Sequence, residues 1–235
     1  MEKKDINVLE QMQNMTVDLN SKVLIEKAEK DGVETMYKRK LGYKVQCGFG
    51  LQGVCCRNCG MGPCRISAKT PRGLCGADEH TIVGRNFARM VAGGTAAHSD
   101  HARDITHTLA LTKPGGDYQV KEPQKLVEFA KFMDVDPEGK DVYELAHEVA
   151  EVCLMEFGKP FGVSKLLKRA PKVRQEIWHN LGIEPRAIDR EIATVMHSTH
   201  IGCCADLEAI IAMSMRCSMA DGWAGSMIGT MISDI

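Results

Sequence analysis

The spacing of apolar side chains predicts helices over most of this chain. Apolar residues recur every three or four positions between residues 5 and 42, and again from residue 79 onwards. Asp31-Gly32 marks a break between two short helices in the first of these regions. No segment shows the strict alternation of apolar and polar residues that is typical of a half-buried strand. The pattern therefore predicts an all-α fold.

The longest predicted helix follows Asp78, which is a suitable N-cap. Gly93-Gly94 in its middle favours a bend or close packing against a neighbour, and Pro114 ends it. Its apolar stripe consists of Ile82, Val83, Phe87, Met90 and Val91. Prolines and glycines separate five further predicted helices, at 122–133, 141–157, 171–182, 184–200 and 205–219.

A cysteine-rich stretch without helical patterning lies between these regions. Residues 47–75 hold six of the ten cysteines and six glycines. Packing alone does not explain this density, because a buried thiol behaves as a small hydrophobe and needs no glycine around it. Soft thiolates at short spacing in a glycine-rich loop are typical of a metal centre. The six residues are Cys47, Cys55, Cys56, Cys59, Cys64 and Cys75.

The spacing of the cysteines favours an iron–sulfur cluster over zinc. Structural zinc usually takes two separated C-x2-C pairs, whereas this stretch has one pair followed by two wider gaps. Ferredoxin-type loops wrap a cluster with such spacing, which assigns Cys56, Cys59, Cys64 and Cys75 to one site. Cys47 and Cys55 are then left over. Two chains related by a two-fold axis could join their leftover pairs into a second four-thiolate site.

Charge and composition narrow the functional class. The 30 basic and 31 acidic residues give a formal net charge of −1, which argues against nucleic acid as the main partner. The first residues have no apolar signal-peptide core, and the most apolar late run, at 207–215, is too short to span a bilayer. We therefore expect a cytoplasmic protein without a transmembrane segment, in which ten cysteines indicate metal binding rather than disulfides.

Two segments resemble the N-terminal region of anaerobic nickel–iron carbon monoxide dehydrogenases. They read CCRNCGMGPCRI and GLCGADEHTIVGRNFARMVAGGTAAHSDHARDI, and the resemblance resumes at HSTHIGCCADLEAIIAMSMRCSMADGWAGSMIGTMISDI. It is close over about 40–112. The resemblance implies a helical domain over 1–235 with a cluster-binding loop at 44–78, without the family's Rossmann-like catalytic domains.

The resemblance also implies cofactors, an activity and partners. A [4Fe–4S] B-cluster would be held by Cys56, Cys59, Cys64 and Cys75. Cys47 and Cys55 would hold half of a D-cluster, [4Fe–4S] or [2Fe–2S], that joins a homodimer. The family is an oxidoreductase that converts CO and water to CO2, two protons and two electrons. This region would relay the electrons to an external carrier such as ferredoxin. The nickel–iron–sulfur C-cluster belongs to the full-length enzyme, so residues 1–235 alone are not expected to oxidise CO.

Histidines on the long predicted helix are candidates for proton transfer. His98 and His101 lie three residues apart and are therefore neighbours on one face. Similar enzymes use histidines at this spacing to carry protons, and His107 lies where the family often has another. Position 104, which tends to be histidine in the family, is Asp104 here. His107 is the weakest candidate, because nine residues turn an ideal helix by about two and a half turns away from His98. The alternative for all three is ordinary exposure on a helix surface.

The remaining cysteines and histidines near the end could form a second metal site. They are His197, His200, Cys203, Cys204 and Cys217. This segment lacks a glycine-rich cradle, so buried thiols are favoured there, and Cys153 is predicted to lie in the core. Two other functions stay open. One is a hybrid-cluster protein that reduces hydroxylamine, although that family typically lacks a counterpart of Cys47 and Cys55. The other is a non-catalytic, zinc-stabilised interaction module.

Overall fold

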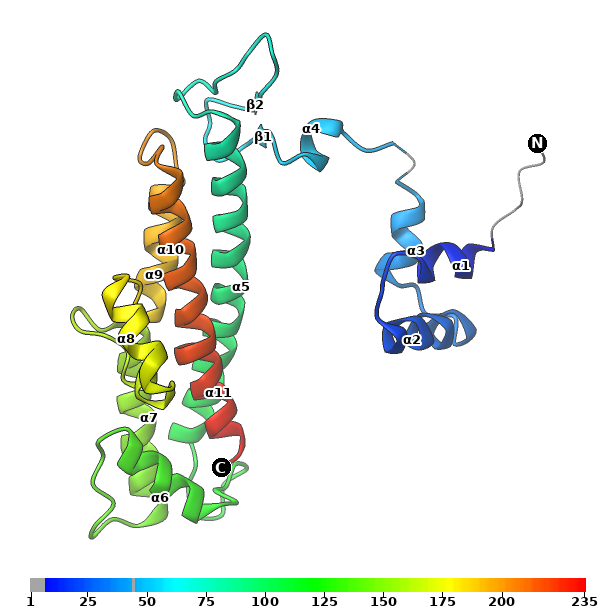
Figure 1. The fold of residues 1–235 in the computed structure, drawn as a ribbon. Coiled ribbons are helices and arrows are strands. Elements are labelled where there is room, and N and C mark those ends of the chain that lie inside the picture. Colours follow the sequence, from blue (N-terminus) through cyan, green and yellow to red (C-terminus); the bar gives the residue numbers. More distant parts are fainter. Residues whose placement is uncertain (1–6, 44) are drawn as a thin grey trace. The chain divides into compact units, whose positions relative to one another are not determined.

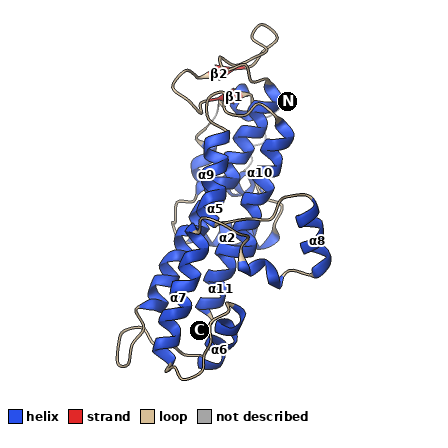
Figure 2. Cartoon of the chain, turned by 90° about the vertical axis from the view of Figure 1, so that its left-hand side faces the viewer, coloured by secondary structure: helices blue, strands red, loops and turns tan. Residues whose placement is uncertain are grey.

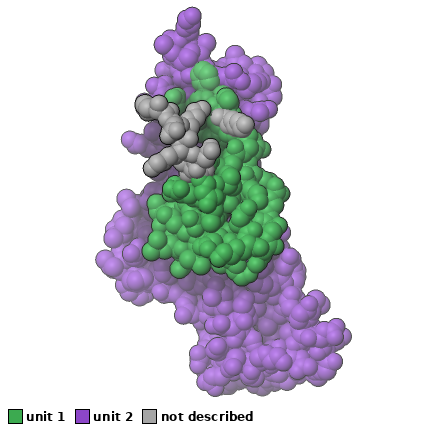
Figure 3. All heavy atoms as spheres, turned by 90° about the vertical axis from the view of Figure 1, so that its right-hand side faces the viewer, with its two compact units in different colours: residues 1–52 green, residues 53–235 purple. Residues whose placement is uncertain are grey.

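The computed structural model describes residues 7–43 and 45–235, which divide into two compact units. Unit 1 comprises residues 1–52 and unit 2 comprises residues 53–235, coloured separately in Figure 3. The boundary falls inside the cluster-binding loop predicted at 44–78. Residues 1–6 and 44, which the predictions for 1–235, 5–42 and 44–78 include, lie outside the described part. A single helical domain over 1–235 stays a prediction.

Unit 1 consists of short helices with polar caps. The predicted break at Asp31-Gly32 is confirmed, because Gly32 ends a helix in the left-handed region with φ of +71°. A second break, which the pattern did not predict, precedes Asp18. The Asp18 carboxylate accepts a hydrogen bond from the Ser21 N–H (2.6 Å) and caps a new helix there. The described helices are α1 (Val8–Gln13), α2 (Leu19–Lys30), α3 (Met36–Leu41) and α4 (Gly48–Leu51).

Unit 2 begins with a short antiparallel ladder and continues as helices. Strand β1 (Cys55–Cys56) pairs with β2 (Cys64–Arg65). The helices, in chain order, are α5 (Glu79–Ala110), α6 (Pro123–Phe132), α7 (Val142–Gly158), the 3₁₀ turn η1 (Lys165–Arg169), α8 (Lys172–Asn180), α9 (Ile188–Ser198), α10 (Leu207–Ala220), the π-helical turn η2 (Asp221–Gly225) and α11 (Ser226–Ser233). Figure 2 shows how little of the chain is strand. The all-α prediction is confirmed.

Helix α5 is the element around which unit 2 is packed. Its 32 residues make a rod about 48 Å long, and the predicted cap is present, since the Asp78 carboxylate accepts from the Thr81 N–H (2.9 Å). Helices α7, α9, α10 and α11 all contact it. In Figure 1 the strands and the turn before α10 lie at the N-terminal end of α5, while α6 lies at its other end. Residues far apart in sequence therefore meet at the start of α5.

The buried face of α5 differs from the predicted apolar stripe. Ile82 is buried, but Val83, Phe87 and Met90 are 42%, 53% and 75% exposed. Small side chains form the packed face instead, including Ala88, Ala92, Thr95 and Ala102. They let neighbouring helices approach closely. A Cβ at Gly84 would lie 2.5 Å from Leu207 Cδ1, so a larger residue there would displace the Leu207 side chain of α10.

Other predictions for these helices fare differently. A Cβ at Gly93 or Gly94 would have no neighbour within 4 Å, so of the two expectations for this pair, a bend or close packing, the structure does not show close packing. Cys153 is fully buried in the main apolar core, as predicted. That core joins residues of α5, α6, α7 and α11, and includes Leu126, Phe129, Val149, Phe157 and Ile228. No helix in the described part of the chain is long and apolar enough to cross a membrane.

Candidate metal centre

Four of the predicted cluster ligands line one small, partly enclosed cavity. The β1–β2 ladder places Cys56 directly opposite Cys64. Cys59 lies in the turn that joins the two strands, and Cys75 lies in the loop between β2 and α5. All four border the same cavity, together with Asn58, Gly73, Leu74, Ile82, Arg85, Thr199 and Ile201. The chain therefore brings these thiols together although the first and the last, Cys56 and Cys75, lie 19 positions apart.

A tight turn and a small apolar core hold the loop in this shape. A Cβ at Gly62 would lie 3.1 Å from both the Cys56 carbonyl oxygen and the Cys64 nitrogen, so the turn between the strands requires glycine there. Beneath the cavity Ile66, Ala77 and Ile82 are buried with Cys56. The helix also anchors the incoming strand, because Asn86 Nδ2 donates to the carbonyl oxygens of Gly53 (2.9 Å) and Cys55 (3.1 Å).

The second wall of the cavity comes from a segment that sequence reasoning did not connect with it. Thr199 and Ile201, in the turn between α9 and α10, border the cavity. Thr81 Oγ1 donates to the Ala205 carbonyl oxygen (3.1 Å), and Arg85 donates to the Cys204 carbonyl oxygen from Nε (3.0 Å) and Nη2. These contacts span 119 and 124 residues of sequence. The sequence carried no signal for this wall, because Arg85 stands out only through its burial in the structure.

Several donors point at the sulfur atoms. The Leu74 N–H lies 3.5 Å from Cys64 Sγ, and Arg85 Nη1 lies 3.4 Å from Cys75 Sγ. Burial alone would raise the pKa of the Cys75 thiol. The backbone N–H groups of Ala77 and Gly202 and the Arg85 guanidinium outweigh burial and hold that pKa below its ordinary value. The site therefore favours Cys75 as a thiolate, the form that ligates metal.

An unpaired amide indicates that a hydrogen-bond acceptor belongs in the cavity. Asn58 Nδ2 is buried and has no hydrogen-bond partner among the described residues, although a buried donor left unpaired is costly. Four thiols, backbone N–H donors and this amide suit an iron–sulfur cluster, whose sulfur atoms accept hydrogen bonds. Among the described residues, no three His, Cys, Asp or Glu side chains surround a point as a single metal ion requires.

Of the two leftover cysteines, only Cys55 belongs to the same unit as this cavity. Cys55 does not border it, as expected for a residue adjacent to Cys56 on a strand, where successive side chains point to opposite faces. Cys47 is exposed and is the N-cap residue of α4 in unit 1. The two predicted D-cluster ligands thus belong to different units.

The predicted proton-transfer histidines also meet a residue that the sequence did not single out. His98 Nδ1 lies 2.9 Å and 3.0 Å from the two carboxylate oxygens of Asp221, in the π-helical turn η2. Ser226 Oγ donates to the same carboxylate. His98 and His101 border a shallow hollow between α5 and α11, which His107 does not reach. Single π-turns are frequent at functional sites, so the structure, rather than the sequence, draws attention to Asp221.

Comparisons with known proteins match the whole of unit 2. Residues 54–235 match the family model described as Prismane/CO dehydrogenase family. The chain belongs to this family. Carbon monoxide dehydrogenase 1 of Methanosarcina acetivorans is 46% identical over 225 residues, which are 94% of this chain and 36% of that protein. Carbon monoxide dehydrogenase 1 of Carboxydothermus hydrogenoformans is 39% identical over 230 residues, with the same coverage.

Solved structures of Prismane/CO dehydrogenase family proteins share the fold. The carbon monoxide dehydrogenase from Thermococcus sp. AM4, in an as-isolated nickel-free form, superposes with a TM-score of 0.82 at 44% identity. The match covers 95% of this chain and 36% of that one. An acetyl-CoA synthase/carbon monoxide dehydrogenase matches 100% of this chain with the same TM-score at 33% identity. The chain spans about a third of the length of these relatives.

The three cysteines near the end of the chain differ in burial. Cys217 is buried, which agrees with the favoured interpretation, whereas Cys203 is exposed and Cys204 is half-buried. The turn that carries Cys203 and Cys204 is held through the backbone carbonyl oxygens of Cys204 and Ala205, which accept hydrogen bonds from Arg85 and Thr81. These contacts do not involve the Cys203 side chain, which is exposed. His197 and His200 are also exposed. All ten cysteines are described, and none of them forms a disulfide.

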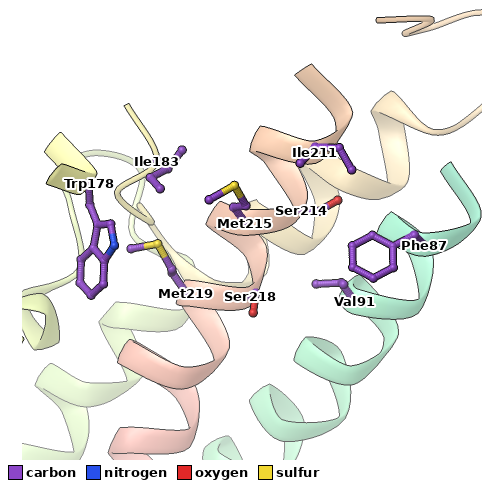
Figure 4. A pocket seen from close by; sticks show the side chains of 9 residues that line it. All are labelled: Phe87, Val91, Trp178, Ile183, Ile211, Ser214, Met215, Ser218 and Met219. Carbon is purple, nitrogen blue, oxygen red and sulfur yellow. The ribbon is translucent and has the colours of Figure 1, made fainter. Parts of the chain in front are cut away.

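An apolar hollow elsewhere in unit 2 has a different character. Figure 4 shows rings and thioethers from α5, α8 and α10 around it. The described residues that line it include no acid, base or thiol: Phe87, Val91, Trp178, Ile183, Ile211, Ser214, Met215, Ser218 and Met219. Chemistry therefore concentrates at the cysteine cavity and the histidine hollow.

Proposed function

We propose that this chain is the electron-relay part of an anaerobic carbon monoxide dehydrogenase. The carrying observation is that Cys56, Cys59, Cys64 and Cys75 border one cavity in a chain of the Prismane/CO dehydrogenase family. These residues would hold a [4Fe–4S] B-cluster. Bound there, the cluster supplies one-electron storage and transfer. The polypeptide contributes the thiolates, hydrogen-bond donors to sulfur, and a wall that limits access of water.

The whole reaction proposed for the complete enzyme is CO + H2O to CO2, two protons and two electrons. Its support is the identity with proteins named carbon monoxide dehydrogenase. We propose that the nickel–iron–sulfur C-cluster required for this oxidation belongs to the full-length enzyme, and that residues 1–235 alone do not oxidise CO. Ferredoxin as the external electron carrier and the cytoplasm as the location stay predictions.

We propose further that Cys47 and Cys55 hold a D-cluster shared with the same pair of a second subunit. The support is a count of thiols together with the placement of Cys55 outside the first cavity. A shared cluster, [4Fe–4S] or [2Fe–2S], would make the homodimer part of the electron path. This proposal rests on two-fold symmetry: an interface that uses the same patch of both chains would bring two thiols from each to one four-thiolate site.

Proton transfer is assigned to His98 and His101, with His107 as the weakest candidate. A carboxylate accepts hydrogen bonds, so the Asp221 carboxylate holds a proton on His98 Nδ1 and leaves Nε2 to accept one. His101 borders the same hollow and can take part in the next transfer. Asp104 is exposed one turn further on and does not border this hollow.

The experiment that tests the relay proposal is metal analysis of the purified chain with its visible spectrum. Anaerobically prepared or reconstituted protein should be brown and contain iron and acid-labile sulfide in equal amounts. At least four iron atoms per chain are expected from the first cavity alone. A colourless protein with zinc bound would instead support the zinc-stabilised interaction module and overturn the proposal.

A further inference from the structure

Arg85 is a buried cation that the described part of the chain gives no carboxylate partner. Its side chain is 2% exposed, and its hydrogen bonds go to the Cys204 carbonyl oxygen and to Cys75 Sγ. No ion pair of Arg85 with a described acidic residue occurs. Burial of an unpaired charge is costly, so proteins place a counter-charge beside it. The side chain borders the cysteine cavity, so the counter-charge expected there is the ligating thiolates and whatever they bind.

We propose that Arg85 tunes the reduction potential of the cluster in this cavity and fixes the wall at 199–205 against it. This rests on the proposed function, because it presumes that the four cysteines hold an iron–sulfur cluster. Hydrogen bonds to cluster sulfur and nearby positive charge stabilise the more negative, reduced state and thereby raise the potential. Arg85 supplies both through its Nη1–H group, 3.4 Å from Cys75 Sγ.

The electron balance of this step is simple. A [4Fe–4S] cluster with four thiolates carries a formal charge of −2 when oxidised and −3 when reduced. One electron enters from an external reductant, and no bond forms or breaks. The guanidinium group keeps its proton over the whole range in which proteins are folded, so this interaction couples no proton to the electron. The effect of Arg85 on the potential should therefore be the same at pH 6.5 and pH 8.5.

A structural role alone has to be separated from tuning, since Arg85 also holds the 199–205 wall. Arg89 provides the matched control. It lies one turn further along α5, and its Nη1 donates to Thr199 Oγ1 (3.1 Å), so it anchors the same wall without a hydrogen bond to any described cysteine. Substitution of Arg89 loosens the wall but leaves the donor to Cys75 Sγ in place.

The test is an EPR-monitored redox titration of the reconstituted 1–235 chain. Dithionite supplies the electrons, and a Cys47→Ser, Cys55→Ser background limits the signal to the first cluster. The variants are Arg85→Lys, Arg85→Met and Arg89→Met. We expect the reduced-to-oxidised ratio at a fixed applied potential to fall about tenfold in Arg85→Met, which is about 59 mV for one electron. Arg85→Lys should fall less, and Arg89→Met should match the parent.

Iron and sulfide contents separate a failure of the proposed relay function from a failure of tuning by Arg85. Absence of a cluster in the parent chain would overturn the proposed function itself, and with it this inference. A cluster that is present in all variants with one common potential would refute tuning by Arg85 alone. An equal fall in the Arg85→Met and Arg89→Met variants would reduce Arg85 to a wall anchor and also overturn it. If Arg85→Met fails to hold iron, Arg85→Lys decides: an unchanged potential, or loss of iron there too, contradicts tuning.

Discussion

Cys56 and Cys64 face each other as direct partners across the β1–β2 ladder. A two-residue strand pair is too short to be stable by its own backbone hydrogen bonds. Its role is to set the distance between the thiols of Cys56 and Cys64. The turn between the strands then adds the third thiol, that of Cys59. The ladder and the bound cluster should therefore stabilise one another, because ligation in such sites is part of the folding free energy.

Replacement of Cys59 tests this coupling. The Cys59→Ala variant should lose most of the iron of one cluster and show a lower melting temperature, because a ligand is removed from the turn between the strands. Iron analysis and thermal unfolding followed by circular dichroism measure both effects. Cys203→Ala is the control, since Cys203 is exposed and outside the cavity. Iron per chain equal to the parent value would contradict the assignment of Cys59 as a cluster ligand.

Removal of the second pair of cysteines tests the bridging cluster. The Cys47→Ser, Cys55→Ser double variant should lose half a cluster per chain, keep the other centre and dimerise less tightly. Shared ligation adds to the packing free energy of an interface, so its loss shifts the association equilibrium. Sedimentation with iron analysis measures both, and Cys203→Ser, Cys204→Ser is the control pair. A parent protein that is monomeric with its clusters intact contradicts the prediction.

The histidine assignment is tested in the complete enzyme. The His98→Leu, His101→Leu variant should slow CO oxidation on the order of 100-fold, because positioned acid–base groups contribute about that much. Asp221→Asn should slow it in the same direction, since the carboxylate that orients His98 is lost. Iron and nickel contents should not change. His107→Leu should have the smallest effect of the three histidine changes. Turnover at the parent rate across neutral pH in the double variant would mean that His98 and His101 are ordinary surface residues.

The buried thiol of Cys153 has a consequence for alkaline stability. Burial, with a smaller contribution from the Glu156 carboxylate, raises the pKa of Cys153 to about 12. Between about pH 9 and pH 12 the unfolded chain releases this proton while the folded chain keeps it, so the free energy of unfolding falls as pH rises. The melting temperature of Cys153→Ala should start lower but decline less steeply over this range. Parallel curves for parent and variant would refute the shifted pKa.

Helix α7 depends on its N-terminal cap. The Asp141 carboxylate accepts hydrogen bonds from the N–H groups of Tyr143 (2.7 Å) and Glu144 (3.0 Å), and the Glu144 carboxylate accepts one from the Asp141 N–H (3.1 Å). Asp141→Ala should therefore cost about 1 kcal/mol of stability. Denaturant unfolding measures it. Glu138→Ala, an exposed change in the preceding turn, should stay within about 0.5 kcal/mol, and equal effects of both would argue against the cap.

Helix content and most breaks could be predicted from the sequence because caps, prolines and glycines act locally. Asp78, Pro123 and Gly32 each lie where the pattern placed a start or an end. The buried face of α5 could not be predicted in this way. Hydrophobicity selected Phe87 and Met90, whereas the close contact of α10 at Gly84 selects small residues on another face. That choice depends on tertiary packing, which periodicity does not encode.

The candidate site could likewise be predicted from the sequence only in part. The spacing of the four cysteines could be recognised because a cluster wraps ligands that are close in sequence. Asp221 and the 199–205 wall could not, because they reach the site only through contacts across more than a hundred residues. Arg85 appeared in the sequence as one more polar residue of a helix. Only its burial beside Cys75 distinguishes it.

The long sequence separation of the Arg85–Cys204 contact has a consequence for synthesis of the protein. A ribosome makes all four cavity cysteines before it reaches Thr199, so the nascent chain carries them without their second wall. For the time needed to add the next 119 residues after Arg85, the ligand thiols are open to solvent, oxidants and competing metals. Chain elongation therefore orders the events: the loop can be loaded with metal early, but it is shielded only when α10 has folded against α5.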